Sequence, residues 1–420
     1  MGETICIVGL GYVGLPLALA FSKHFPVIGF DVNEKRIMEL QQGKDSSSSV
    51  FTSDFQNRNI QFTSNADELK KATVIIVAVP TPVDEAKRPD LSYLQNASSL
   101  IGKNLQKRTL VIYESTVYPG VTEDVCLPIL EKESGLQLGE FDLGYSPERI
   151  NPGDDLHRLD NVIKIVSGHD SACLQRVAQL YETIVSAGIY CAQSIKVAEA
   201  AKITENIQRD VNIALMNELS MVYHKLGIDT KNVLDAAGTK WNFHKYYPGL
   251  VGGHCIGIDP YYLAFQATQK GYHPKLILAG REINDYMAKH ITELCMKELN
   301  KKGKVLKDSR VLLMGLTFKE NVTDFRNSRA KDVVNYLKEY GITVYGCEPH
   351  MTDVVVKEQY NIEPVSLSTI PACDAIIVIN KHTQFNSLTL DNLQCSILLD
   401  IKHMFSQKEV EEKGITYITL

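Results

Sequence analysis

Short, continuous runs of apolar residues alternate with helical stretches through the first part of the chain. Runs that are rich in β-branched residues and lack polar alternation are typical of strands buried on both faces of a parallel sheet. Strands are predicted at Thr4–Leu10, Val27–Asp31, Ile60–Thr63, Thr73–Val79, Thr109–Ser115, Phe141–Ser146 and Val162–Ser167. The pattern therefore predicts an α/β fold with a doubly wound sheet.

The pattern changes near Lys196, where apolar residues recur at three and four positions, without glycine or proline, as far as Leu226. Such a length predicts a helix that spans domains or packs between subunits. After Gly303 the strands return, at Arg310–Phe318, Thr343–Cys347, Ala375–Asn380, Ser396–Ile401 and Thr416–Ile418. We therefore expect two Rossmann-like doubly wound domains, residues 1–195 and 301–420, joined by a central helical domain at residues 196–300.

The composition is that of an ordinary soluble protein, with 44% hydrophobic residues, 22% charged residues and a net charge of -6. This balance argues against nucleic-acid binding. The apolar stretch Thr4–Phe21 lacks a basic flank and a cleavage site, and its glycines suit a phosphate-binding turn better than a signal or membrane segment. The nine cysteines are scattered without a CxxC pair, which favours neither disulfides nor a zinc ribbon. We expect a cytoplasmic protein with no membrane partner.

The first predicted strand leads directly into Gly9-Leu10-Gly11-Tyr12-Val13-Gly14, a GxGxxG fingerprint that a helix follows. The three glycines allow a tight turn, close approach of backbone to a pyrophosphate, and packing of helix on strand. Asp31, at the end of the second strand, suits the adenosine ribose hydroxyls and repels a 2′-phosphate. NAD is therefore predicted over NADP, against the alternative of a merely glycine-rich turn. Arg36 either stacks on the adenine or is an ordinary solvated arginine.

Two later strand ends belong to the same predicted cleft, because ligands of open α/β sheets bind at the carboxyl ends of the strands. They carry the segments Val79-Pro80-Thr81-Pro82 and Glu114-Ser115-Thr116-Val117-Tyr118-Pro119-Gly120. Both are also explained as simple proline-marked loops. Their small hydroxyl groups, however, suit the nicotinamide ribose and a catalytic water.

Cys255 lies in the segment Gly252-Gly253-His254-Cys255-Ile256-Gly257-Ile258-Asp259-Pro260, which is unlike a packed core strand. Most cysteines are inert, but a thiol in a glycine-cleared loop beside a redox cofactor fits nucleophilic catalysis, which needs the thiolate. Lys202 is the candidate ammonium group. It shares one helix face with Asn206, although that pair alone would be an ordinary solvated surface.

These motifs occur in the order found in the UDP-sugar 6-dehydrogenases, and the chain resembles that family over essentially its whole length. Further segments that carry the resemblance are Ser146-Pro147-Glu148-Arg149, Gly315-Leu316-Thr317-Phe318-Lys319 and Thr323-Asp324-Phe325-Arg326. The resemblance implies an NAD-dependent, four-electron oxidation of a sugar C6 alcohol to a carboxylate, with two hydride transfers at one site.

The resemblance also implies residue roles. Cys255 attacks the C6 aldehyde to form a thiohemiacetal, and the second oxidation leaves a thioester that water hydrolyses. Lys202 stabilises the developing oxyanion, while the remaining catalytic residues orient alcohol and water or assist proton transfer: Asn206, Asp259, Glu148 and Thr116. Cofactor contacts are implied for Gly9, Gly11, Tyr12, Val13, Gly14, Asp31, Arg36, Thr81, Thr116 and Arg326. Substrate contacts are implied for Glu148, Arg149, Lys202, Asn206, Tyr246, Gly252 and Lys319. Outside these motifs, Lys319 and Arg326 would pass for ordinary surface cations.

The residues around the thiol bear on the identity of the sugar. UDP-glucose enzymes usually read GGSCFPKD, with a cofactor-contacting lysine where this chain has Ile258. The GGHC form resembles the branch that oxidises UDP-N-acetylhexosamines. The segments Tyr246-Tyr247-Pro248-Gly249-Leu250-Val251 and Asp259-Pro260-Tyr261-Tyr262-Leu263 resemble UDP-N-acetylglucosamine and UDP-N-acetylgalactosamine dehydrogenases more than UDP-N-acetylmannosamine enzymes. We expect UDP-N-acetylglucosamine as the substrate, with UDP-N-acetylgalactosamine next. A metal-free site is expected, since adjacent His254 and Cys255 rarely chelate one ion.

Several alternatives stay open. The alternative substrates are UDP-glucose and UDP-N-acetylmannosamine. A two-electron β-hydroxyacid dehydrogenase shares the first domain and the helix, but leaves Cys255 and the last domain unexplained. A non-enzymatic NAD-sensing protein would not need the thiol. Residues 199–226 are expected to form the core of a homodimer. The resemblance suggests synthesis of precursors for surface polysaccharides, such as capsule or the O-antigen of lipopolysaccharide.

Overall fold

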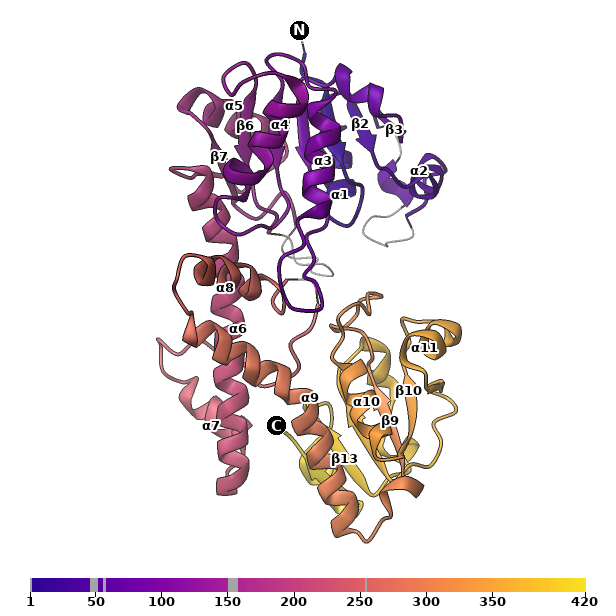
Figure 1. Cartoon of the computed structure of the whole chain (residues 1–420). Coiled ribbons are helices and arrows are strands. Elements are labelled where there is room, and N and C mark those ends of the chain that lie inside the picture. The colour runs from indigo at the N-terminus through magenta and orange to yellow at the C-terminus, as the bar shows by residue number, and fades with distance from the viewer. Residues whose placement is uncertain (1, 46–51, 56–57, 150–157, 254) are drawn as a thin grey trace. The chain divides into compact units, whose positions relative to one another are not determined.

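The computed structural model describes the chain apart from residues 1, 46–51, 56–57, 150–157 and 254 (Figure 1). It divides into two compact units. Unit 1 comprises residues 1–206 and 261–273, and unit 2 comprises residues 207–260 and 274–420. Two of the junctions fall inside helices, namely α6 (Ile195–Leu226) and α8 (Asp259–Gln269). The predicted division into three domains stays a prediction.

Unit 1 is built on an eight-stranded sheet in the order β3-β2-β1-β4-β5-β6-β7-β8. Its strands are β1 (Ile5–Val8), β2 (Val27–Phe30), β3 (Ile60–Thr63), β4 (Val74–Val77), β5 (Leu110–Tyr113), β6 (Asp142–Tyr145), β7 (Lys164–Gly168) and β8 (Ile189–Cys191). The order 3-2-1-4-5-6 is that of dinucleotide-binding folds. Every residue of β1, β2, β4 and β5 is buried, so the doubly wound sheet predicted from the apolar runs is confirmed.

The far edge of this sheet is not purely parallel. β7 pairs antiparallel with β6, and β8 pairs parallel with β7. The sequence did not predict β8, because Tyr190 and Cys191 are exposed. A short edge strand of this kind carries no continuous apolar run that would reveal it.

Helices cover both faces of the sheet. One apolar core contains residues of α1 (Gly14–Phe21), α2 (Glu34–Gln41) and α5 (Ser171–Glu182). The other contains residues of α3 (Ser92–Gly102) and α4 (Leu127–Ser134). Strand residues alternate between them: Ile5 and Ile7 of β1 enter the first core, whereas Cys6 and Val8 enter the second. Burial on both faces is the reason why the strands lack polar alternation.

The middle of the chain is helical. α6 confirms the long helix predicted from Lys196 to Leu226, and it is followed by α7 (Thr230–Ala237), α8 and α9 (Lys275–Lys301). Figure 1 labels these helices along the chain. Within the described residues, the structure contains no helix that is both long enough and apolar enough to cross a membrane.

Unit 2 contains a six-stranded sheet in the order β11-β10-β9-β12-β13-β14, with every neighbouring pair parallel. Its strands are β9 (Arg310–Met314), β10 (Thr343–Cys347), β11 (Glu363–Pro364), β12 (Ala375–Val378), β13 (Ile397–Asp400) and β14 (Thr416–Ile418). The helices that follow β9 along the chain are α10 (Ala330–Glu339), α11 (Asp353–Tyr360) and α12 (Gln407–Glu412). The strand order repeats that of unit 1, which confirms the second Rossmann-like domain. The two-residue strand β11 was not predicted.

Candidate active site

The turn between β1 and α1 has the shape that a dinucleotide site requires. Gly9 has a φ of +94°, and a Cβ there would lie 2.8 Å from the carbonyl oxygen of Ala78. A Cβ on Gly14 would lie 1.8 Å from the Gly9 oxygen, whereas one on Gly11 would meet nothing within 4 Å. Helix α1 begins without a side-chain cap, which leaves its first N–H groups for an anion. The turn therefore fits a pyrophosphate.

The acid that follows β2 is held against this turn. Asp31 Oδ2 accepts the N–H of Leu10 at 2.9 Å, and Oδ1 accepts the N–H of Asn33 at 2.9 Å. Arg36 donates to the Leu10 carbonyl oxygen from Nε at 3.1 Å, and its Nη2 lies 2.7 Å from Asp45. The structure thus brings both predicted cofactor-binding residues to the glycine turn. The stacking of Arg36 on adenine stays a prediction.

The two strand-end loops that were predicted to flank the cofactor lie side by side. The hydroxyl of Ser115, after β5, donates to the carbonyl oxygen of Val79, after β4, at 2.7 Å. Thr81 and Thr116 belong to these loops and are both partly exposed. Their hydroxyl groups therefore lie at the carboxyl ends of neighbouring parallel strands, where open α/β sheets bind ligands.

Two helices brace these loops. The hydroxyl of Tyr262, on α8, donates to the carbonyl oxygen of Pro82 at 3.0 Å. Glu199, on α6, accepts the N–H groups of Gly120 and Thr122 at 2.5 and 3.0 Å. It thereby caps the π-helical turn that begins at Thr122. Burial raises the pKa of Glu199 to about 7. Sequence reasoning did not single out Glu199 for a role.

Helix α6 also carries two of the predicted catalytic residues. Lys202 and Asn206 are buried, as is Glu148 after β6. Arg149 joins the loop after β6 to this helix, with Nη2 2.7 Å from Glu205. Within the described part of the chain, the ammonium of Lys202 has no hydrogen-bond or ion-pair partner. Because buried charges are normally paired, this cation is suited to an anionic group of a ligand.

The predicted nucleophile belongs to unit 2, in a segment that we call the thiol loop, residues 249–259. The carbonyl oxygen of Cys255 accepts the N–H groups of Ile258 and Asp259 at 3.0 and 2.8 Å, which closes a turn ahead of α8. Gly253 has a φ of +84°, and a Cβ there would lie 2.8 Å from the ring of Phe318. Asp259 is buried and Cys255 is half-buried. The glycine thus lets the loop pack closely beside the thiol.

The segment after β9 holds the thiol loop in place. The carbonyl oxygen of Asn327 accepts the N–H of Gly253 at 3.3 Å, and a Cβ on Gly252 would lie 2.7 Å from the same oxygen. Arg329 donates from Nε to the carbonyl oxygen of Val251 at 3.3 Å. Both glycines are therefore required for the close approach of the two segments.

The other predicted ligand-binding residues of unit 2 lie in three places. The hydroxyl of Tyr246 donates to a glutamine of α6 at 3.1 Å. Lys319 is half-buried in the segment after β9. Arg326 pairs with Asp324 of its own segment at 2.7 Å, and its side chain is 61% exposed. Their contacts with the cofactor or the sugar stay predictions, and His254 lies outside the described residues.

Sequence reasoning missed a buried polar network between α6 and α9. Asp210 accepts hydrogen bonds from Arg281 at 2.5 Å and from Asn284 at 2.8 Å. Asn217 donates to Asn284 at 2.8 Å and accepts the N–H of Gly249, in the thiol loop, at 2.8 Å. The available signal was the spacing of three and four residues, which continues along α6 from the predicted Lys202 and Asn206 positions. Polar residues on a buried helix face need partners.

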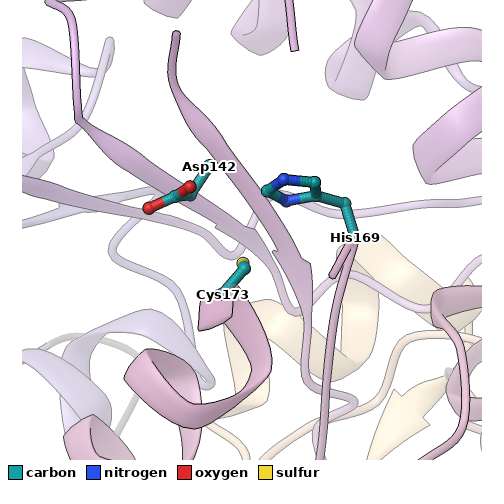
Figure 2. Close-up of side chains that lie close together, drawn as sticks. All are labelled: Asp142, His169 and Cys173. Carbon is teal, nitrogen blue, oxygen red and sulfur yellow. The ribbon is translucent and has the colours of Figure 1, made fainter. Parts of the chain in front are cut away.

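Unit 1 also gathers three side chains whose ligand atoms lie within 4.8 Å of one another, those of Asp142, His169 and Cys173 (Figure 2). Each already has a protein partner. His169 Nδ1 accepts the N–H of Leu143 at 3.2 Å, Cys173 donates to the Leu143 carbonyl oxygen at 3.3 Å, and Asp142 pairs with Arg176 at 3.0 Å. Burial raises the pKa of Cys173 to about 12, and a metal needs the thiolate. We interpret this cluster as structural.

Two sheets of dinucleotide-binding order, a turn shaped for a pyrophosphate and a thiol in a glycine-cleared loop define a nucleotide-dependent dehydrogenase. The comparisons identify its family along the whole chain. Residues 3–185 match the NAD binding domain of the UDP-glucose/GDP-mannose dehydrogenase family, residues 196–286 match its central domain, and residues 312–407 match its UDP binding domain. The chain belongs to this family, and it is a nucleotide-sugar dehydrogenase that uses a nicotinamide cofactor.

Individual relatives are similar over nearly their whole length. The chain is 48% identical to Protein CapL from Staphylococcus aureus over 415 residues, which cover 98% of each chain. It is 49% identical to UDP-N-acetyl-D-glucosamine 6-dehydrogenase from Pseudomonas aeruginosa, over 96% of this chain and 97% of the relative. The solved structure of UDP-D-ManNAc dehydrogenase from Pyrococcus horikoshii matches with a TM-score of 0.87 and 27% identity, over 99% and 98% of the two chains. The family resemblance predicted from the motifs is thus confirmed.

Proposed function

We propose that this protein oxidises the C6 hydroxyl group of UDP-N-acetylglucosamine to a carboxylate, with NAD as oxidant and Cys255 as covalent nucleophile. The observation that carries the proposal is the thiol loop, in which Gly252 and Gly253 allow a half-buried thiol to lie one turn before the buried carboxyl group of Asp259. The similarity to a UDP-N-acetylglucosamine 6-dehydrogenase over the full chain supports the choice of reaction.

The glycine turn of unit 1 supports NAD as the cofactor. The open space beside Gly11 and the uncapped start of α1 suit the pyrophosphate, and Asp31 suits an unmodified adenosine ribose. NAD, when bound, accepts one hydride from C6 in each of the two oxidations. Gly9, Tyr12, Val13, Gly14, Arg36, Thr81, Thr116 and Arg326 complete the proposed cofactor-binding set.

The thiol explains why an alcohol is carried to an acid. The first oxidation removes a hydride from C6 and a proton from its hydroxyl group, which gives an aldehyde. The sulfur of Cys255 then adds to the aldehyde carbon as a thiohemiacetal, and the second oxidation removes the remaining hydride and the hydroxyl proton to leave a thioester. Water breaks the C–S bond, which releases the uronate and restores the thiol.

Charged and polar residues are proposed to serve these steps. The ammonium of Lys202 stabilises the oxyanion that develops on the sugar, which its burial without a partner in the described residues supports. Asn206 and Asp259 orient the reacting alcohol and the hydrolytic water. Glu148 takes up the proton of the sugar hydroxyl, and Thr116 assists the water. The remaining proposed substrate contacts come from Arg149, Tyr246, Gly252 and Lys319.

The sugar is assigned as UDP-N-acetylglucosamine, with UDP-N-acetylgalactosamine as the next candidate. His254 and Ile258 depart from the thiol loop of UDP-glucose enzymes. The relative named for UDP-N-acetylglucosamine is 49% identical, against 27% for the solved UDP-D-ManNAc dehydrogenase. We also propose a homodimer with α6 at its core. A role in supplying precursors for a surface polysaccharide is proposed as well, and the similarity to Protein CapL supports it. Family membership does not favour the β-hydroxyacid alternative.

A substrate screen tests the reaction. NADH release is measured with UDP-glucose and with the N-acetylated gluco, galacto and manno sugars, and UDP-N-acetylglucosamine is expected to give the highest kcat/KM and two NADH per sugar. A higher kcat/KM for another sugar would overturn the substrate assignment. One NADH with a stable carbonyl product would favour the two-electron alternative, and no oxidation of any sugar would favour a non-enzymatic protein.

A matched pair of cysteine variants tests the covalent mechanism. Cys255→Ser is expected to abolish uronate formation. Single turnover of the unmodified enzyme, quenched with acid before hydrolysis is complete, should show a sugar acyl group on Cys255 by mass spectrometry. Cys191→Ser changes an exposed cysteine of β8 and is expected to leave both observations unaltered. Retention of two NADH per sugar by Cys255→Ser would refute the thioester.

A further inference from the structure

Lys164 is a buried cation with no assigned role. It is the first residue of β7, and its side chain is only 4% exposed. Lysine is almost never fully buried in a protein unless a partner compensates its charge. The partners of Lys164 therefore indicate what the charge is for.

Two groups outside the proposed site hold the ammonium of Lys164. Glu114, which follows β5, has Oε2 at 2.9 Å from Nζ. Tyr181, on α5, places its ring centroid 5.2 Å from Nζ, and its hydroxyl group donates to Oε1 of Glu114. Both side chains are buried. These three residues thus belong to one buried cluster of charged and polar groups.

The third charge of the cluster is the proposed proton acceptor Glu148. Its Oε2 lies 3.5 Å from Nζ of Lys164, and its Oε1 accepts the N–H of Arg149 at 2.6 Å. One ammonium therefore faces two carboxylates, and a single proton makes the cluster neutral. Burial raises the pKa of Glu114 to about 7, with Lys164 opposing the rise and Glu148 adding to it.

We infer that Lys164 is a positioning residue for the oxidation: its ammonium, backed by Glu114 and Tyr181, faces the carboxyl group of Glu148 and holds it in place as a proton acceptor. The inference rests on the proposed function, in which Glu148 takes up the proton of the sugar hydroxyl. Lys164 acts through Glu148 and not on the sugar.

The other charged and titratable groups near Glu148 have partners of their own. Arg149, beside Glu148, directs its guanidinium away from the cluster, to Glu205 of α6 at 2.7 Å and to the carbonyl oxygen of Ile163 at 2.7 Å. Glu114 and Tyr181 are the titratable groups that β5 and α5 contribute. Lys164 places its ammonium against the Glu148 carboxylate at 3.5 Å.

The test is the pH profile of the first NADH released in single turnover, a step that precedes attack by Cys255. Lys164→Met is expected to move the acidic limb of this profile up by about 1–3 pH units, because a cation within hydrogen-bonding range lowers a carboxyl pKa by about that much. The rate should recover as the pH rises above the limb, and Lys164→Arg should restore the limb. A loss that is equal at every pH would overturn the inference.

Two further variants separate charge from folding. Lys164→Met/Glu114→Gln removes the cation together with one carboxylate, so it should fold where Lys164→Met does not, and its limb should lie above that of the wild type. An unshifted limb in a folded double variant would also overturn the inference. Lys107→Met removes a surface lysine that pairs with Glu140 at 2.8 Å and should leave the profile unchanged.

Glu148→Gln, measured beside these variants, distinguishes this inference from the proposed function. It should lose the limb and most of the rate. If Glu148→Gln retained the full rate and profile, the proposed role of Glu148 would be wrong. If Glu148→Gln lost the limb while Lys164→Met kept the wild-type limb, the role of Lys164 alone would be wrong.

Discussion

Gly253→Ala is the perturbation that examines the thiol loop most directly. Gly253 has a φ of +84°, in the left-handed region that disfavours every side chain. The added Cβ would also lie 2.8 Å from the ring of Phe318, closer than the roughly 3.5–4.0 Å at which carbon atoms attract each other. The substitution thus combines a backbone strain with a steric clash two residues before Cys255.

The two effects have separate magnitudes. The left-handed conformation costs an alanine about 1–2 kcal/mol, and an extra carbon in a packed contact costs about 1–3 kcal/mol. Gly253→Ala should therefore destabilise unit 2 by about 2–5 kcal/mol. Gly303→Ala supplies the matched control, because Gly303 has a φ of +71° but no atom within 4 Å of its added Cβ. It should show the backbone cost alone.

The free energy of unfolding is measured by urea denaturation followed by circular dichroism, and uronate formation is measured alongside. Gly253→Ala should be the more destabilising variant and should lower kcat, whereas Gly303→Ala should leave kcat unchanged. Adding Phe318→Ala should relieve the clash, so that the double variant loses less than the two single losses combined. Equal losses in Gly253→Ala and Gly303→Ala would refute the close packing of the thiol loop on Phe318.

Three other residues give sharp expectations. Glu199 keeps its proton up to about pH 7 in the folded protein. The unfolding free energy of the wild type relative to Glu199→Gln should therefore fall between pH 4.5 and 7 by on the order of 3 kcal/mol. A difference that stays constant with pH would contradict this. Asp31→Asn should shift the NAD/NADP ratio of kcat/KM toward NADP by roughly tenfold or more, because it removes a charge that repels the 2′-phosphate; an unchanged ratio would count against Asp31 as the ribose acid. Arg281→Met should lower the unfolding free energy by about 3–5 kcal/mol, because it leaves the buried Asp210 without its cation. Thermal unfolding should show most of that loss recovered in Arg281→Met/Asp210→Leu. No recovery would mean that the arginine acts by packing.

The apolar pattern predicted the sheets well but placed the strand ends too far along the chain. Strands were expected to reach Val79, Ser115 and Phe318, whereas β4, β5 and β9 end at Val77, Tyr113 and Met314. The reason is physical: residues past a strand end stay wholly or partly buried when a loop packs over the sheet, so the apolar run does not stop where the ladder stops. These extra residues belong to the loops that form the candidate site.

Site residues could be predicted where a ligand imposes a local spacing, and were missed where only the tertiary fold brings groups together. The glycine turn and the thiol loop are contiguous in sequence, so their residues could be singled out as candidates. Glu114, Lys164 and Tyr181 lie on three elements, and only the sheet order places them in contact. A lysine inside the apolar run Val162–Ser167 was nevertheless a signal, because such a charge requires a buried partner.

The two sheets share one strand order, but the acidic residues that follow their second strands differ in burial. Asp31 stays partly exposed, and this exposure leaves its carboxylate within reach of a ribose. In unit 2, Glu348 occupies the corresponding position after the second strand of its sheet, but its Oε2 accepts the N–H of Leu316 at 2.6 Å and lies 3.0 Å from Nε2 of His382. Its Oε1 accepts the N–H of His350 at 2.9 Å, and the side chain is wholly buried. Both oxygens of Asp31 also accept N–H groups, so burial is what separates the two acids. Because Glu348 is enclosed, the second sheet keeps the dinucleotide scaffold without an accessible ribose acid.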